Sequence, residues 1–279
     1  MNKKVILNQK YEDYWKLTLE YSDFYGKPFN TVLAIIVNYI DKYAKEDKGL
    51  PSEYYKKLQT DIERYFKKED SASTRKSINQ MFKLGFINNK GSGYHYLTKQ
   101  FLTESDKEKK RMLYSRIIYD NASFSRSYTN PSNVNEIKFL VKTLEACGQI
   151  TKDELVAIMF CDINEISKGY LTRKELNVKM SKIIIDDTIT RKYNQRNYLF
   201  KLCGELTDIY THNNLISLNP NLIIDKDEQV KSGRDPYLQR LYKIELINEE
   251  KILYNDMVAK CVLEHLGYPV LIASHIKPY

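Results

Sequence analysis

The stretch from Asp70 to Leu97, DSASTRKSINQMFKLGFINNKGSGYHYL, decides the fold expected for this chain. It opens with residue types that favour helix N-termini and continues with apolar residues at helical spacing as far as Gly85, which predicts a helix end. The polar, glycine-rich turn at residues 88–93 separates two short apolar runs, and this pattern predicts a two-stranded hairpin. His95 in this hairpin is expected to lie at the surface or to face a groove.

The side of this helix opposite its apolar residues is polar and basic. Arg, Asn and Gln side chains pair with base edges in the major groove, whereas Ser, Thr and Lys suit phosphates. A helix with such a face, followed by a short hairpin, has the order of a winged-helix unit, although a solvated amphipathic helix beside an ordinary hairpin would give the same pattern. The candidate DNA-binding residues, all expected to be exposed, are Ser73, Thr74, Arg75, Lys76, Asn79, Gln80 and Lys83.

The same order recurs later in the chain. Residues 186–204 begin with basic and amide side chains, become apolar and end at Gly204, and residues 206–220 have a hairpin pattern around a turn at 211–214. Helices are predicted before this unit at residues 133–147, after a Thr151–Glu154 capping box, and at residues 172–185. Because the succession of a polar-faced helix, a glycine and a hairpin occurs twice, the winged-helix interpretation is favoured. The second set of candidate DNA-binding residues is Thr190, Arg191, Lys192, Asn194, Gln195, Arg196 and Asn197.

The remaining pattern is mostly helical. Residues 11–84 predict helices with breaks at 26–28 and 48–51, and a linker helix is predicted over residues 99–118. The fold class expected is mainly α with short β-hairpins (α+β). We expect a first winged-helix subdomain with its linker helix at residues 1–125, a second at 126–224, and a linker, a helical arm and an incomplete nuclease segment, described below, at 225–279. The polar stretch 121–133 contains a proline and is interpreted as the boundary between the first two.

Composition favours an anionic partner. The chain has 279 residues, a formal net charge of +8, a pI near 9.0 and 23 tyrosines. A coding bias toward Lys, Asn, Ile and Tyr would account for part of this. No apolar run approaches the ~20 residues of a membrane span, and the first residues lack a secretory apolar region, so we expect a soluble intracellular protein. The four cysteines form no CxxC pair and predict neither a zinc ribbon nor a disulfide scaffold.

The last residues, Ala273-Ser274-His275-Ile276-Lys277-Pro278-Tyr279, carry the first resemblance. They resemble the opening of the HNH (ββα-metal) nuclease motif of many restriction endonucleases, in which Trp usually stands where this chain has Tyr279. The resemblance implies that His275 is the general base that activates water, with Mg²⁺ or a similar divalent metal as cofactor. On base rates, a single histidine at a strand end is more often structural. The motif also needs an Asn and a further metal ligand beyond the residues present, so we expect these 279 residues to bind DNA without cutting it.

A second resemblance covers roughly residues 70–222. The strings Ser73-Thr74-Arg75, Leu84-Gly85-Phe86, Gly148–Leu155 and Leu218-Asn219-Pro220 resemble the recognition domain of type IIS restriction and nicking endonucleases. That family implies tandem winged-helix subdomains, a monomer on an asymmetric site in double-stranded DNA, a cognate methyltransferase as functional partner and a prokaryotic cytoplasm. The members compared carry a PD-(D/E)xK nuclease domain, from which this HNH-like ending departs.

Two alternatives without nuclease activity remain open. A winged-helix transcription regulator would bind a palindrome as a dimer, and a tandem winged-helix replication initiator of plasmids would bind iterated repeats.

Overall fold

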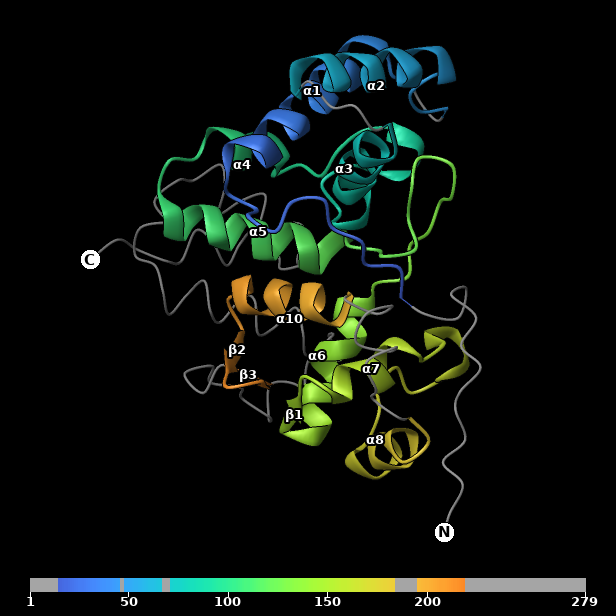
Figure 1. Cartoon of the computed structure of the whole chain (residues 1–279), viewed down its shortest axis with the longest axis vertical. Helices are drawn as coiled ribbons and strands as arrows, with labels where there is room; N and C mark the ends of the chain where they lie inside the picture. Colours follow the sequence, from blue (N-terminus) through green and yellow to red (C-terminus); the bar gives the residue numbers. More distant parts are fainter. Residues whose placement is uncertain (1–14, 46–47, 67–70, 184–194, 219–279) are drawn as a thin grey trace, which may run out of the picture. The chain divides into compact units, whose positions relative to one another are not determined.

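The computed structural model describes residues 15–45, 48–66, 71–183 and 195–218 (Figure 1). These residues are mainly helical and include a small three-stranded antiparallel sheet, so the predicted class of helices with short strands is confirmed. No described helix is long and apolar enough to span a membrane. The elements are α1 (Lys27–Tyr43), α2 (Ser52–Phe66), α3 (Ser71–Lys83), α4 (Thr98–Thr103), α5 (Lys107–Asn121), α6 (Glu136–Cys147), β1 (Gln149–Thr151), α7 (Glu154–Met159), α8 (Arg173–Met180), α10 (Gln195–Glu205), β2 (Ile209–His212) and β3 (Leu215–Leu218).

The first half, from Trp15 to Asn121, packs α1, α2 and α3 against one another. Apolar residues of α1 recur at spacings of three and four and are buried, as its sequence predicts. An aromatic cluster continues this core toward α4 and α5. The ring centroids of Phe29 and Phe86 lie 5.5 Å apart, those of Phe86 and Phe101 4.9 Å, and those of Phe24 and Tyr114 5.0 Å. All five rings are buried, and aromatic rings at such separations contribute to stability beyond their buried area.

The second half runs in the order α6, β1, α7, α8, α10, β2, β3. Gly148, with φ of 76°, ends α6 as predicted. Thr151 and Glu154 form the predicted reciprocal bonds, because Glu154 accepts from the Thr151 N–H at 2.7 Å and donates its own N–H to Thr151 Oγ1 at 3.2 Å. The predicted second hairpin is confirmed as β2 and β3. The sheet order is β1-β3-β2, with Ile150 opposite Ile216.

Three predictions about the first half were wrong. Residues 15–24 are not helical, although the pattern from residue 11 predicted a helix. The linker helix is split into α4 and α5, because Glu104 accepts the N–H groups of Ser105 and Asp106 and Asp106 caps α5 by accepting from Lys109. The first hairpin is reduced to a single bridge between Ile87 and Tyr94 around a 3₁₀ turn at Asn89–Gly91.

The two halves belong to one compact unit, Met1–Ser217, and contact each other along α5. Arg111 of α5 donates to the carbonyl oxygens of Gly204, Glu205 and Leu206 at 3.4, 3.2 and 3.3 Å, at the end of α10 (Figure 1). Trp15 adds a second contact, donating its backbone N–H to Met159 at 3.0 Å and its indole N–H to Cys161 at 3.2 Å. The subdomain borders given above stay predictions, and the segment 225–279 lies outside the described residues.

Candidate nucleic-acid interface

The candidate residues of α3 divide into an exposed and a buried group. Arg75 and Lys76 are exposed, and Ser73 and Asn79 are half-buried. Thr74, Gln80 and Lys83 were expected to be exposed, and this was wrong: their exposed fractions are 0%, 0% and 7%. Gln80 and Lys83 are buried because the non-helical segment 15–24 covers the polar side of the C-terminal half of α3, whereas Thr74 is buried in the N-terminal half of the helix.

Gln80 uses its side chain to hold that segment. The backbone N–H groups of Glu20 and Tyr21 donate to Gln80 Oε1 at 2.8 and 2.9 Å, and Gln80 Nε2 donates to the Tyr21 carbonyl at 2.8 Å. A non-helical backbone needs such partners when it is buried. The amide of Gln80 is therefore committed to the fold and is not available to a base edge.

Lys83 is likewise used inside the molecule. Its ammonium group donates to the carbonyl oxygens of Lys16 and Phe124, and its burial lowers its pKa to about 8. Glu136, at the start of α6, accepts the Phe124 N–H at 2.9 Å, and burial raises the pKa of this carboxyl to about 7, with Lys83 acting in the opposite direction. Through the backbone of Phe124, Lys83 and Glu136 link α3 to the start of α6.

What α3 leaves exposed is continuous with two neighbouring segments. Asn79 Oδ1 accepts the Tyr128 N–H at 3.4 Å, and Asn89 Oδ1 accepts the Ser132 N–H at 3.1 Å. We name the exposed and half-buried polar residues of α3 and of the 88–92 turn the α3 surface, which the 125–133 loop borders. No aspartate or glutamate occurs between Ser71 and Thr103 or between Asn121 and Asn135. The α3 surface therefore combines basic and neutral polar groups without an acidic residue of its own segments.

The second set of candidates is only partly described. Gln195 is buried with an exposed fraction of 5%, which corrects its expected exposure, and Asn197 is half-buried. Arg196 pairs with Asp153 at 2.5 Å, so its charge is partly neutralised inside the molecule. Four further candidates lie outside the described residues: Thr190, Arg191, Lys192 and Asn194.

The surface around α10 nevertheless carries basic and aromatic groups. Lys152 lies over the Phe200 ring at 5.2 Å, Lys201 is exposed, and Tyr210 of β2 is 52% exposed beside His212. Aromatic and cationic groups of this kind suit contacts with nucleic acid.

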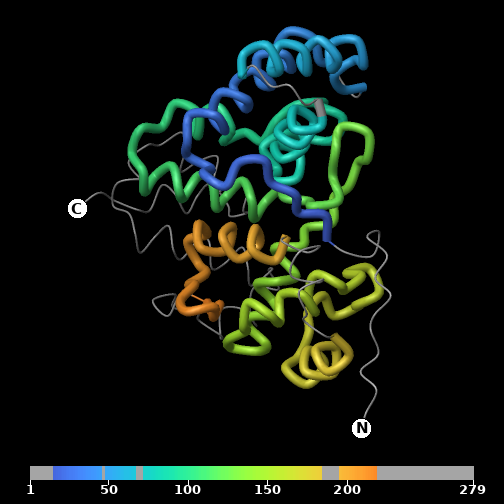
Figure 2. The backbone as a smooth tube through the Cα atoms, viewed as in Figure 1, coloured from blue at the N-terminus to red at the C-terminus, as the bar shows by residue number. Residues whose placement is uncertain are grey.

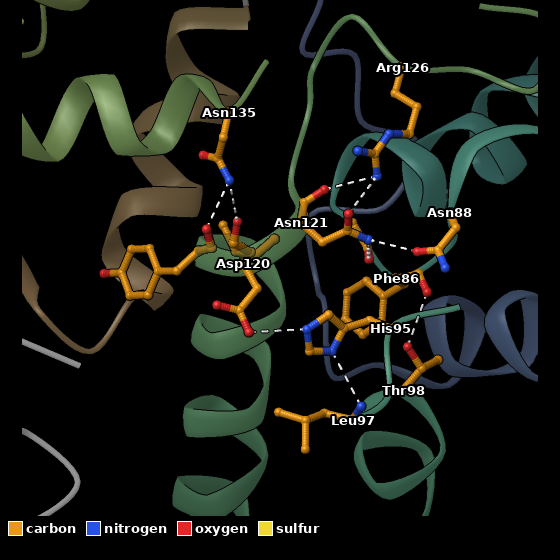
Figure 3. Close-up of polar contacts among 12 residues, drawn as sticks. Phe86, Asn88, His95, Leu97, Thr98, Asp120, Asn121, Arg126 and Asn135 are labelled. Atoms are coloured by element: carbon orange, nitrogen blue, oxygen red, sulfur yellow. Dashed lines mark hydrogen bonds and ion pairs between the residues drawn. The ribbon is translucent and has the colours of Figure 1, made fainter. Parts of the chain in front are cut away.

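A buried polar network supports the α3 surface from beneath (Figure 3). His95 Nε2 lies 3.2 Å from Asp120 Oδ2, and the Leu97 N–H donates to His95 Nδ1 at 3.3 Å, which assigns the proton to Nε2. Asn121 donates to Gly85 and Asn88 at 2.6 and 3.1 Å. His95 was expected at the surface, but it is 6% exposed because it ties the turn to α5.

His275 lies outside the described residues, and so does any metal site that would include it. Among the described ranges, no group of three or more His, Cys, Asp or Glu side chains is placed to hold a metal ion. Cys147, Cys161 and Cys203 are free thiols there, and burial raises the pKa of Cys161 to about 11.

No family model matches the chain, and neither a curated protein nor a solved structure is significantly similar to it.

The residues that sequence reasoning missed are those of the 125–133 loop, above all Tyr128. The signal available for them is the absence of acidic residues from Asn121 to Asn135, in a stretch whose polarity and proline indicate only a boundary.

Proposed function

We propose that this chain recognises a specific sequence in double-stranded DNA, as the recognition part of a type IIS restriction endonuclease with tandem winged-helix units. The observation that carries this is the second half, where α10 leads directly into the β2–β3 hairpin and β1 pairs with the far strand of that hairpin. In a winged-helix unit the last helix stands directly before the hairpin, and an earlier strand completes the sheet. The order β1, α10, β2, β3, with basic residues on α10, therefore supports such a unit, whose last helix enters the major groove.

The α3 surface supports a second contact with the same duplex. Arg75 and Lys76 are exposed there, and their own segment contains no acidic residue; the acidic group bonded to this surface is Glu20 of the segment 15–24, whose carboxylate accepts from Ser73. Guanidinium groups pair bidentately with guanine, and each good pair is worth about 1–3 kcal/mol of discrimination. Lysine contacts to phosphate set the register and make the affinity depend on salt.

Hydrolysis is the part of the proposal that depends on His275. In a complete HNH site the imidazole of His275 would take a proton from water, and a divalent metal such as Mg²⁺ would stabilise the developing charge. The support is the resemblance of residues 273–278 to the HNH opening. A cognate methyltransferase would be the functional partner of such an enzyme.

The test is a binding selection on random duplexes at a stated salt concentration, with and without adenine or cytosine methylation. We expect one asymmetric sequence to be enriched and the complex to contain a single protein chain. Enrichment of a palindrome by a dimer would support the transcription regulator instead, and iterated repeats would support the replication initiator. The absence of any sequence preference would overturn the recognition proposal.

A matched pair of variants locates the surface. Lys76→Ala removes an exposed charge from α3, and Lys174→Ala removes an exposed charge from α8. We expect Lys76→Ala to weaken binding and to reduce the slope of log affinity against log salt by about 1, whereas Lys174→Ala changes neither.

A further inference from the structure

The loop between α5 and α6, residues 125–133, is held by more hydrogen bonds than a connection between subdomains requires. Arg126 is 3% exposed, and its guanidinium donates to the Ser132 carbonyl at 2.8 Å, the Asn121 carbonyl at 2.9 Å and Asn121 Oδ1 at 3.1 Å. Figure 3 shows Arg126 reaching Asn121 above the His95 network. One buried side chain thus fastens both ends of the loop.

The tip of the loop is closed by its own polar groups. The Ser127 N–H donates to the Asn130 carbonyl at 2.9 Å, the Asn130 N–H donates to Ser127 Oγ at 3.1 Å, and Asn130 Nδ2 donates to the Ser125 carbonyl at 2.8 Å. Thr129, Asn130 and Pro131 remain exposed. The tip therefore presents two small polar side chains, Thr129 and Asn130, beside Pro131, with Thr129 Oγ1 3.4 Å from Ser127 Oγ.

Tyr128 fixes this tip beside α3. Its ring stacks on Tyr55 of α2 with centroids 3.7 Å apart and an interplanar angle of 4°, and its hydroxyl donates to the Leu50 carbonyl at 2.7 Å. Burial raises the pKa of Tyr55 to about 12, while the positive charge of Arg75 acts in the opposite direction, so Arg75 lies close to the stack. Figure 2 shows the loop running beside α3.

From these contacts we infer that the 125–133 loop is a further DNA-contacting element beside α3, which binds the phosphate backbone of the same duplex. The inference rests on the proposed function. Hydroxyl and amide groups are frequent phosphate ligands, and a tip held by a buried arginine loses little conformational entropy on binding. No acidic residue between Asn121 and Asn135 opposes a phosphate.

Opposite charges at one exposed position test the inference. Thr129→Lys should tighten binding to the selected duplex severalfold and steepen the salt dependence by about 0.9, whereas Thr129→Asp should weaken binding roughly tenfold. Misfolding weakens binding in both variants, so opposite changes cannot arise from it. Thr103, also exposed, ends α4, which Figure 1 places on the other side of α3 from the loop, and Thr103→Lys and Thr103→Asp are the matched controls.

The outcomes separate this inference from the proposed function. If the unaltered chain binds a specific duplex and Lys76→Ala weakens it, but both Thr129 variants bind like the unaltered chain, the loop inference is overturned and the recognition proposal stands. Equal shifts at Thr103 and Thr129 would also overturn it, since the effect would then come from net charge. If the unaltered chain binds no duplex, the proposed function and the loop inference both fail.

Discussion

The α3 unit (residues 71–97) and the α10 unit (residues 195–218) have the same order in sequence, a helix with polar residues followed by a chain reversal. In the α10 unit the reversal is a two-stranded hairpin that pairs with β1. In the α3 unit it is one bridge, and two of the helix's amide and basic residues bond to buried backbone. The order of residues therefore predicts the path of the chain, whereas the neighbouring segments decide which polar side chains stay exposed.

The two reversals differ because their turns differ. Asn213 and Asn214 both have positive φ, 46° and 64°, and a two-residue turn of this kind matches the twist of paired strands. In the α3 unit a 3₁₀ turn separates the arms, and His95 then turns inward to Asp120, so the second arm ends before it can extend the ladder.

The largest expected effect concerns two buried glutamines, Gln80 near the end of α3 and Gln195 at the start of α10. Gln80→Leu should lower the free energy of unfolding by about 4 kcal/mol, because the N–H groups of Glu20 and Tyr21 and the Tyr21 carbonyl would lose their partner. Gln195→Leu should cost less than about 1 kcal/mol, because Gln195 Oε1 has no hydrogen-bond partner among the described residues. Urea denaturation of both variants measures the difference, and equal losses would contradict it.

The next effect depends on pH. Burial raises the pKa of Glu136 from 4.5 to about 7, so the folded protein holds this proton more tightly than the unfolded chain does. The resulting stabilisation is complete below pH 4.5 and is lost as the pH rises to about 7, a change of up to about 3 kcal/mol. Urea denaturation between pH 4.5 and 7 should show this slope.

Glu136→Gln should remove the slope, and Glu53→Gln, at an exposed glutamate of α2, should retain it. Persistence of the slope in Glu136→Gln would show that another group causes it. The α10 unit is joined to α5 by Arg111 and backbone carbonyls, and such a contact adds no titration in this range.

The third effect compares the arginines of the two helices in DNA binding. Arg75 is exposed on the α3 surface, whereas Arg196 has an exposed side-chain fraction of 12% and pairs with Asp153. Arg75→Ala should weaken binding to the selected duplex by about 2 kcal/mol, and Arg196→Ala by less than about 1 kcal/mol. Fluorescence anisotropy titrations measure both, and a larger loss for Arg196 would place the principal contact on α10.

These comparisons separate what the sequence could predict from what it could not. Helix limits at Gly26, Gly85 and Gly148, the Thr151–Glu154 capping box and the second hairpin follow from local residue chemistry. The burial of Gln80 and Lys83 could not be predicted locally, because it depends on backbone groups about 60 residues away that need polar partners. The role of Tyr128 was missed for the same reason, since Tyr55 and Leu50 precede it by more than 70 residues.

The smallest expected effect concerns the turns themselves. Lys90, at φ 56°, and Asn214, at φ 64°, are both exposed residues in left-handed backbone. This conformation costs an ordinary L-residue about 1–2 kcal/mol, of which the greater freedom of glycine in the unfolded chain cancels part. Lys90→Gly should therefore raise the free energy of unfolding by roughly 0.5 kcal/mol. Asn214→Gly should leave it unchanged or lower it, because asparagine already tolerates this conformation. If Asn214→Gly raised the free energy of unfolding as much as Lys90→Gly, the asparagines would not favour the α10 hairpin. The contrast between the two reversals would then have to come from their flanking strands.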